Sequence, residues 1–279
     1  MRIVVTGISG YIGFHLAKRF CSEGHEVIGV YNAAEQEKID ALKSVLGCKL
    51  IKTDLRKAVA MIEREVDCLV HCAGLKGILN SNEKPFEFYD TNIKLMLNAY
   101  RTQAKHFVFI STGIAETSDS PYAKSKRVCE EMLRDMSSAK VTVLRLFNPI
   151  GTEHPLFIDK QNVLQALYSA DVNDSVFSVM GNGIRDYIDI RDASDMAYEI
   201  ISKRQHSETK YGVFEIGTTI GVSVMELLNA YCSSLSRSVR IEHVHTREND
   251  TSISVASFGC VPKYTLRDTI MSYVELLGN

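Results

Sequence analysis

The 279-residue chain is long enough for one large domain, or for a large domain with a smaller one beside it. Hydrophobic residues make up 45% and charged residues 24%, and the formal net charge of −2 leaves no basic surplus for binding nucleic acid or an anionic membrane. No apolar run approaches the ~20 residues that span a bilayer, and no signal peptide is recognisable, so we expect a cytoplasmic protein.

The first half of the chain alternates short apolar segments with amphipathic ones. Strands are predicted at 2–6, 26–31, 49–52, 68–72, 107–110 and 141–146, and helices near 12–23, 35–45, 85–104 and 121–137. Strands that alternate with helices predict βαβ units, hence an α/β fold with a Rossmann-type, doubly wound parallel sheet. We assign residues 1–148 to this NAD(P)-binding domain.

A glycine-rich turn follows the first predicted strand. It reads Thr6-Gly7-Ile8-Ser9-Gly10-Tyr11-Ile12-Gly13 and opens the first helix. Glycines allow a tight turn and a close approach of the backbone to a pyrophosphate, whose charge the helix N-terminus stabilises. We therefore predict a dinucleotide site formed by Gly7, Ser9, Gly10, Tyr11, Ile12 and Gly13.

The second predicted strand ends at Tyr31-Asn32 without a carboxylate. An acidic residue at this point would bind the adenosine ribose and repel a 2′-phosphate. Without it, nothing at this position excludes the 2′-phosphate of NADP(H). No arginine stands there to bind the phosphate either. We predict NADP(H) or NAD(H), with NADP slightly favoured, and place Asn32, Asp54 and Leu55 beside the adenosine.

The seven cysteines are scattered, and their odd number argues against a disulfide framework. Cys68 and Cys72 share one predicted strand, which holds them too far apart to bond. No further ligand at short spacing suggests a metal site. We expect buried free thiols, and we expect His71, at the end of the same strand, to be a packed histidine rather than a base.

A tyrosine and a lysine lie one helical turn apart in Pro121-Tyr122-Ala123-Lys124-Ser125-Lys126. A free phenol has a pKa near ~10 and is a poor base at neutral pH. A nearby ammonium and a positively charged nicotinamide favour the phenolate, so Tyr122 is a candidate acid/base and Lys126 its partner. Ser111 and Thr112 end the preceding strand, and either hydroxyl could hold a substrate oxygen.

The alternation loosens after residue 148. Strands are predicted at 176–180, 186–190, 211–216 and 239–244, and helices at 160–170, 191–203, 223–234 and 265–277. We assign residues 149–279 mainly to a smaller C-terminal substrate-binding lobe, with some segments returning to the Rossmann domain. Ligands of open α/β sheets bind at the carboxyl ends of the strands, which places the site between the two lobes.

These motifs resemble the extended short-chain dehydrogenase/reductases of the nucleotide-sugar epimerase/dehydratase group. Besides the glycine turn, Ser111-Thr112 and the Tyr122/Lys126 pair, the resemblance rests on His71-Cys72-Ala73-Gly74, Asn92, Arg145-Leu146-Phe147-Asn148-Pro149, Gly183-Ile184-Arg185-Asp186-Tyr187 and Arg247-x-x-Asp250. It covers nearly the whole chain.

The resemblance implies specific roles for these residues. Thr112 would bind the 4-oxygen of a sugar, Tyr122 would exchange its proton, and Lys126 would bind the nicotinamide ribose. Lys76 would lie near both cofactor and substrate. The remaining implied contacts are Ala73, Gly74 and Asn92 to the cofactor, and Asn148, Arg185, Arg247 and Asp250 to a nucleotide diphosphate. The resemblance also implies a homodimer that pairs through the helices containing Asn92 and Tyr122.

Three functions fit these observations. The favoured one is an NADPH-dependent reductase of a nucleotide-linked 4-keto-6-deoxy sugar, because the chain is compact and lacks the ribose carboxylate. The alternative is a nucleotide-sugar 4-epimerase with tightly bound NAD, suggested by Ala73-Gly74-Leu75-Lys76. The third is a non-catalytic dinucleotide-binding sensor or scaffold.

The chain departs from the family pattern in two places. Gly113-Ile114 stands where dehydratases of this group carry an Asp-Glu pair, so 4,6-dehydration is not expected. The loop between Thr112 and Tyr122 is also shorter than is usual for the family.

Overall fold

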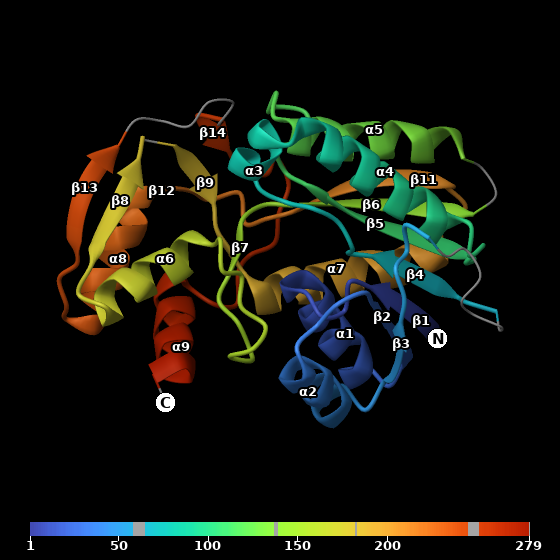
Figure 1. The fold of residues 1–279 in the computed structure, drawn as a ribbon, viewed down its shortest axis with the longest axis horizontal. Coiled ribbons are helices and arrows are strands. Elements are labelled where there is room, and N and C mark those ends of the chain that lie inside the picture. Colours follow the sequence, from blue (N-terminus) through green and yellow to red (C-terminus); the bar gives the residue numbers. More distant parts are fainter. Residues whose placement is uncertain (58–64, 137–138, 182, 245–250, 279) are drawn as a thin grey trace.

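A seven-stranded parallel sheet forms the centre of the protein (Figure 1). The computed structural model describes residues 1–57, 65–136, 139–181, 183–244 and 251–278. The strand order is β11-β6-β5-β4-β1-β2-β3, and all paired neighbours are parallel. The strands are β1 (Arg2–Thr6), β2 (Glu26–Tyr31), β3 (Lys49–Lys52), β4 (Cys68–His71), β5 (His106–Thr112), β6 (Lys140–Leu146) and β11 (Tyr211–Ile216). The predicted α/β fold with a Rossmann-type sheet is confirmed.

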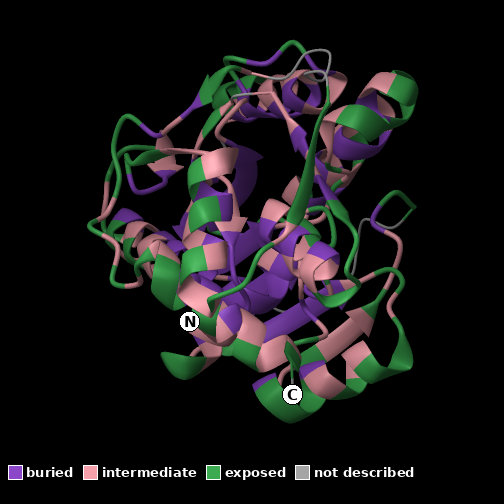
Figure 2. Ribbon diagram, turned by 90° about the vertical axis from the view of Figure 1, so that its left-hand side faces the viewer, coloured by how far each residue is buried: buried purple, intermediate pink, exposed green. Residues whose placement is uncertain are grey.

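Helices cover both faces of this sheet (Figure 1). On one face lie α1 (Tyr11–Ser22), α2 (Gln36–Leu46) and α7 (Ile190–Gln205), and on the other α4 (Pro85–Tyr100) and α5 (Pro121–Asp135). Successive side chains of β5 pack against the helices on opposite faces of the sheet, because side chains alternate along a strand. Val108 and Ile110 pack in the cluster that contains α1 and α7, whereas Phe107 and Phe109 pack in the one that contains α4 and α5. Figure 2 shows the buried strands at the centre, between half-exposed helices.

A smaller lobe lies beside the sheet domain and has its own core (Figure 1). Its elements are β7 (Pro149–Ile150), α6 (Val163–Val172), β8 (Val176–Met180), β9 (Ile184–Asp186), β10 (Ile188–Asp189), β12 (Gly221–Ser223), α8 (Val224–Leu235), β13 (Arg240–Val244), β14 (Ile253–Ser254) and α9 (Leu266–Gly278). The core contains Leu164, Phe177, Leu227, Tyr231 and Ile270. Between these elements, α7 and β11 lie with the large sheet, since β11 pairs with β6 and α7 packs against α1.

Several short elements differ from the predicted ones. The helix α3 (Ile78–Glu83) and the strands β7, β12 and β14 were not predicted, because segments this short show no clear hydrophobic period. The single strand predicted at 186–190 is two strands, β9 and β10, and α7 already begins at Ile190. The Asp189 side chain caps α7 by accepting from the Arg191 N–H at 2.8 Å, which ends the strand there. Within the described residues, no helix is both long enough and apolar enough to cross a membrane.

Candidate active site

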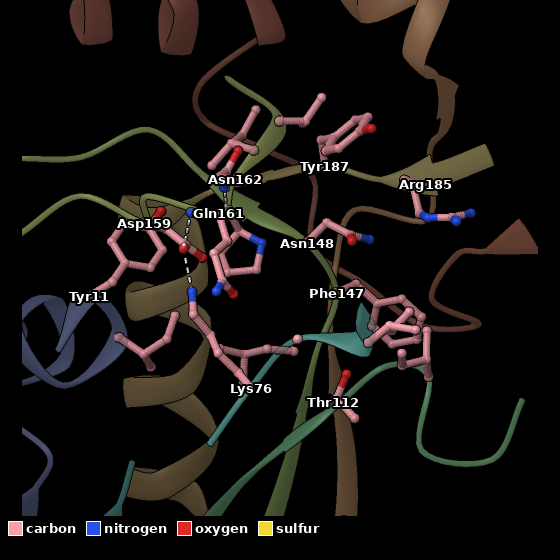
Figure 3. Close-up of a pocket in the computed structure, with 18 of the residues that line it drawn as sticks. Tyr11, Lys76, Thr112, Phe147, Asn148, Asp159, Gln161, Asn162, Arg185 and Tyr187 are labelled. Atoms are coloured by element: carbon pink, nitrogen blue, oxygen red, sulfur yellow. Dashed lines mark hydrogen bonds and ion pairs between the residues drawn. The ribbon is translucent and has the colours of Figure 1, made fainter. Parts of the chain in front are cut away.

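A cavity of about 790 Å³ opens at the carboxyl ends of the sheet strands and extends into the smaller lobe. Its lining includes the glycine turn, the ends of β5 and β6, the start of α5, and residues of α6, β8 and β9. Figure 3 shows Lys76 and Asp159 on one side of this cavity and Arg185 on the other, with Asn148 between them. The cavity thus lies where ligands bind in open α/β sheets.

The glycine turn can accept a pyrophosphate. Gly7 has a φ of +69°, and a Cβ there would lie only 2.8 Å from the backbone N of Ala73. A Cβ on Gly13 would collide with the carbonyl of Gly7, so the helix α1 can pack this closely only with glycine. Gly10, the N-cap of α1, has no side chain to cap the first N–H groups, and the first turn carries no acidic residue. These donors and the helix dipole therefore face the cavity and fit an anionic dinucleotide.

Tyr11 and Ile12 continue this wall of the cavity, whereas Ser9 is not among its lining residues. The Tyr11 hydroxyl donates to the carbonyl of Gly151 at 3.0 Å. That contact joins the start of α1 to the segment that follows β7.

The three residues predicted beside the adenosine also lie outside the cavity lining. Asn32 is exposed after β2. The Asp54 carboxylate binds the Arg56 guanidinium at 2.9 Å, and this contact lowers the pKa of Asp54 to about 2. Leu55 is buried, and its carbonyl accepts from Asn98 at 2.7 Å. Their cofactor contacts remain predictions.

The loop after β4 is held against α5 by a buried amide. Asn92 accepts from the Leu75 N–H at 2.7 Å and donates to the Ser125 hydroxyl at 2.9 Å. Gly74 lines the cavity, and a Cβ there would lie 3.4 Å from the Lys126 ammonium nitrogen. Ala73 packs against Gly7. Asn92, which was predicted to contact the cofactor, therefore holds this loop by its hydrogen bond with the backbone of Leu75.

Tyr122, Lys126 and Thr112 meet at the carboxyl end of β5. The helix α5 begins at Pro121, directly after its N-cap Ser120, and this places Tyr122 and Lys126 one turn apart beside the strand end. The Lys126 ammonium donates to the carbonyl of Ile110 at 2.9 Å and is almost fully buried. The side chains of Tyr122 and Thr112 share a hydrogen bond. Ser111 donates instead to the carboxylate of Glu130, so Thr112 is the hydroxyl paired with the tyrosine.

Burial determines the charge state of this group of residues. Burial raises the pKa of Tyr122, the hydrogen bond with Thr112 opposes that rise, and the charge of Asp159 adds to it. The sequence predicted that Lys126 and a bound nicotinamide together would favour the phenolate, whereas in the protein alone burial has the largest effect on the pKa of Tyr122. Burial also lowers the pKa of Lys126, and the neighbouring Cys129, Cys72 and Glu130 oppose this fall. In the protein itself the phenol is therefore the resting form.

The substrate side of the cavity contains two of the predicted residues. Asn148 lines it and donates to the carbonyl of Asp186 at 3.3 Å. Arg185 also lines it and donates to the carbonyl of Ile184 at 3.0 Å. The neighbouring Asp186 carboxylate accepts from the Thr218 hydroxyl and from the N–H groups of Thr218, Thr219 and Ala256, so it holds a loop together. Arg247 and Asp250 lie outside the described residues.

Lys76 forms an ion pair that the sequence did not predict. Its ammonium contacts the carboxylate of Asp159, which also accepts from the Gln161 N–H at 3.0 Å (Figure 3). Among the described residues that line the cavity, Asp159 is the one carboxylate, and the cations of the lining are Lys76, Lys126 and Arg185. Asn162 caps α6 through the Leu164 N–H at 2.9 Å. Of these contacts, only the Asn162 cap could have been predicted from the sequence, because an asparagine before an apolar run is typical of a helix start.

His71 is a packed histidine, as predicted. It is 1% exposed, its Nδ1 lies 2.8 Å from the Thr6 hydroxyl, and burial lowers its pKa to about 3. The seven cysteines are free, with Cys68 buried and Cys72 half-buried at the cavity. No group of three or more His, Cys, Asp or Glu side chains within the described part of the chain is placed to hold a metal ion.

Comparison with known proteins gives consistent matches over most of the chain. The sequence model of the NAD-dependent epimerase/dehydratase family matches residues 3–217. The UDP-glucose 4-epimerase of Bacillus subtilis is 29% identical over 92% of this chain and 88% of its own, and UDP-glucose 4-epimerase 2 of Arabidopsis thaliana is 27% identical over 91% and 87%. The structure of the Bifidobacterium longum UDP-glucose 4-epimerase in complex with NAD+ and UDP superposes with a TM-score of 0.87 at 24% identity, covering 99% of this chain and 98% of that one.

Proposed function

This chain belongs to the NAD-dependent epimerase/dehydratase family, and we propose that it is a 4-epimerase of nucleotide-diphosphate sugars that keeps its NAD bound through the reaction. It is an enzyme of the extended short-chain dehydrogenase/reductase type. The observation that carries the proposal is the Thr112–Tyr122–Lys126 group at the end of β5, in one cavity with the glycine turn. Curated relatives that match about nine-tenths of the chain, named as UDP-glucose 4-epimerases, support this reading over the ketoreductase that the sequence alone favoured.

The residues present fit NAD. The first turn of α1 offers N–H donors without a side-chain cap for the pyrophosphate, and Lys126, buried in the cavity lining, would bind the nicotinamide ribose. The NADP preference inferred from Asn32 finds no support in the comparisons, and NAD is the proposed cofactor. When bound, NAD supplies the acceptor and donor of a hydride at the sugar carbon.

The side chains of this protein would handle the proton. Thr112 would donate a hydrogen bond to the 4-oxygen of the sugar, and the phenolate form of Tyr122 would take the hydroxyl proton as the hydride leaves C4. The buried Lys126 cation, together with the positive charge that NAD would bring, would stabilise the phenolate that begins the cycle. Return of the hydride to the other face of the 4-keto sugar takes the proton back from Tyr122. Each cycle thus begins and ends with the same deprotonated tyrosine and the same cofactor.

The substrate is proposed as a UDP sugar. The cations Lys76 and Arg185 on opposite sides of the cavity suit a diphosphate, and Asn148 lies between them (Figure 3). The relatives compared above are named as UDP-glucose 4-epimerases, and this supports uridine as the base of the substrate. A homodimer through α4 and α5, which the resemblance implies, stays a prediction.

The cofactor content of the purified protein tests this function. Denaturation should release about one NAD per chain, because an enzyme that returns its hydride has no need to exchange the cofactor. A protein that is purified empty, and that then binds NADPH better than NADH, would point to the ketoreductase. The intact Thr112, Tyr122 and Lys126 argue against the third reading, a sensor that only binds the dinucleotide.

A further inference from the structure

A buried ion pair lies beside the catalytic residues and takes no part in the proposed chemistry. Glu130 is on α5, one turn after Lys126, and is 1% exposed. Its carboxylate accepts from the Arg145 guanidinium at 2.6 and 3.1 Å and also from the Ser111 hydroxyl. Burying a charge carries a large desolvation penalty, which only close partners offset. The arrangement therefore needs an explanation beyond simple packing.

The partners of Glu130 lie next to the residues of the site. Ser111 and Arg145 are paired across β5 and β6, one position before Thr112 and Leu146. The carbonyl of Ile110, on the other side of Ser111, accepts from Lys126. The Glu130 side chain thus ties α5, which carries Tyr122 and Lys126, to the strand that carries Thr112.

The reaction depends on this relative placement. Thr112 and Tyr122 come from two different elements, and both must reach the same sugar oxygen. A shift of about 1 Å between catalytic groups can cost about 100-fold in rate. The short loop of residues 113–120 joins the two elements. The contacts of Glu130 connect α5 and β5 through side chains, in addition to that loop.

We propose that Glu130, held by Ser111 and Arg145, is a positioning residue that sets the reacting geometry of Thr112, Tyr122 and Lys126. The inference rests on the proposed function, because the geometry matters only for a hydride and proton transfer at this site. Glu130 transfers no proton in this proposal, because its side-chain contacts given above are to Ser111 and Arg145.

The chain offers a matched control for this carboxylate. Arg145 also binds Glu116 at 2.7 Å, but the Glu116 side chain is 65% exposed and belongs to the short loop. An ion pair with an exposed partner contributes little, because water screens it. Glu130→Gln and Glu116→Gln therefore remove the same charge from the same arginine, and only the first removes it from the buried contact with Ser111.

The experiment compares both variants with wild type in the conversion of UDP-galactose. We expect Glu130→Gln to lower kcat by about 10- to 100-fold, with KM and bound NAD within about twofold of wild type, because the substrate contacts are kept while the catalytic groups shift. Glu116→Gln should keep kcat within about twofold. A wild-type kcat in Glu130→Gln, or an equal loss of kcat, NAD and thermal stability, would overturn the positioning role.

Milder variants keep the test decisive if Glu130→Gln does not fold. Ser111→Ala removes only the hydroxyl that donates to Glu130, and Ser111→Thr restores a hydroxyl. We expect kcat to fall in the first and to recover in the second. An unchanged kcat in Ser111→Ala would contradict the proposal.

Amide hydrogen exchange separates this inference from the proposed function. It is measured without substrate on peptides that cover 108–114 and 121–127, where Glu130→Gln should exchange faster than Glu116→Gln and wild type. A wild-type protein inactive on UDP-galactose would count against the proposed function and leave this comparison intact. Equal exchange in all three proteins would overturn the positioning role whatever the reaction.

Discussion

At the residue scale, the hydroxyl of Tyr122 is the group on which the chemistry depends. It is buried, it is protonated in the protein without cofactor, and it shares a hydrogen bond with Thr112. Replacing Tyr122 by Phe removes the proton carrier and leaves the ring in place. We expect kcat to fall by about 10²- to 10⁴-fold, the usual contribution of a positioned acid/base, while bound NAD is unchanged.

Tyr198→Phe is the matched control for that variant. The Tyr198 hydroxyl donates to Glu23 at 3.2 Å on the surface of the sheet domain, away from the cavity lining. Its kcat should equal that of wild type. Full activity in Tyr122→Phe, measured by the rate of UDP-galactose conversion, would remove the tyrosine from the mechanism.

Asp159 gives a prediction about pH. Its negative charge raises the pKa of Tyr122, so Asp159→Asn should lower that pKa. The phenolate would then form at lower pH, and the acidic limb of the pH profile of kcat/KM should move to lower pH. Asp174→Asn, at an exposed carboxylate of the smaller lobe, should leave the profile in place. A limb that moves upward in Asp159→Asn, or that moves equally in both variants, would contradict this electrostatic account.

At the scale of single elements, the first turn of α1 depends on glycine for two separable reasons. Gly7 and Gly24 both have positive φ, at +69° and +75°, but a Cβ would meet the backbone of residue 73 only at Gly7. Gly24→Ala should therefore cost about 1 kcal/mol of backbone strain and spare the cofactor. Gly7→Ala should cost more and abolish retention of NAD, measured as NAD released on denaturation. Equal cofactor content in both variants would show that close packing at Gly7 is not needed.

The sequence predicted the long, periodic elements well, because their patterns are local. The first three strands have the predicted bounds, and Tyr122, Lys126 and Thr112 meet as expected. The contacts that escaped prediction join distant segments. Lys76 was singled out, but its partner Asp159 lies in a loop with no motif, and Glu130 carried no signal until the fold placed it beside Ser111 and Arg145. The charge state of Tyr122 also depended on burial, which the sequence does not report.

At the scale of the whole molecule, buried neutral histidines tie stability to pH. His15 is fully buried with a pKa lowered to about 4, and His71 and His106 have pKa values of about 3 and 4. Unfolding restores pKa values near ~6.5, so the unfolded chain binds more protons below that pH. The stability these groups contribute is complete above about pH 6.5 and is lost as the pH falls toward 4 and then 3, by a few kcal/mol for each.

Thermal unfolding between pH 7 and pH 4 tests this expectation. The melting temperature should fall as the pH drops, and the fall should be smaller in His15→Gln, which lacks one of the titrating groups. His206→Gln, at an exposed histidine after α7, should show the wild-type slope. A wild-type slope in His15→Gln would mean that His15 does not control the pH response.

The conversion of UDP-galactose without added cofactor tests the central claim most directly. The purified protein is incubated with UDP-galactose alone, the sugar products are identified by NMR, and the absorbance of reduced nicotinamide is followed in the same sample. A 4-epimerase with retained NAD predicts UDP-glucose formed over many turnovers, with no net production of NADH. No product under these conditions, together with oxidation of added NADPH by a nucleotide-linked 4-keto sugar, would contradict the epimerase and establish the reductase.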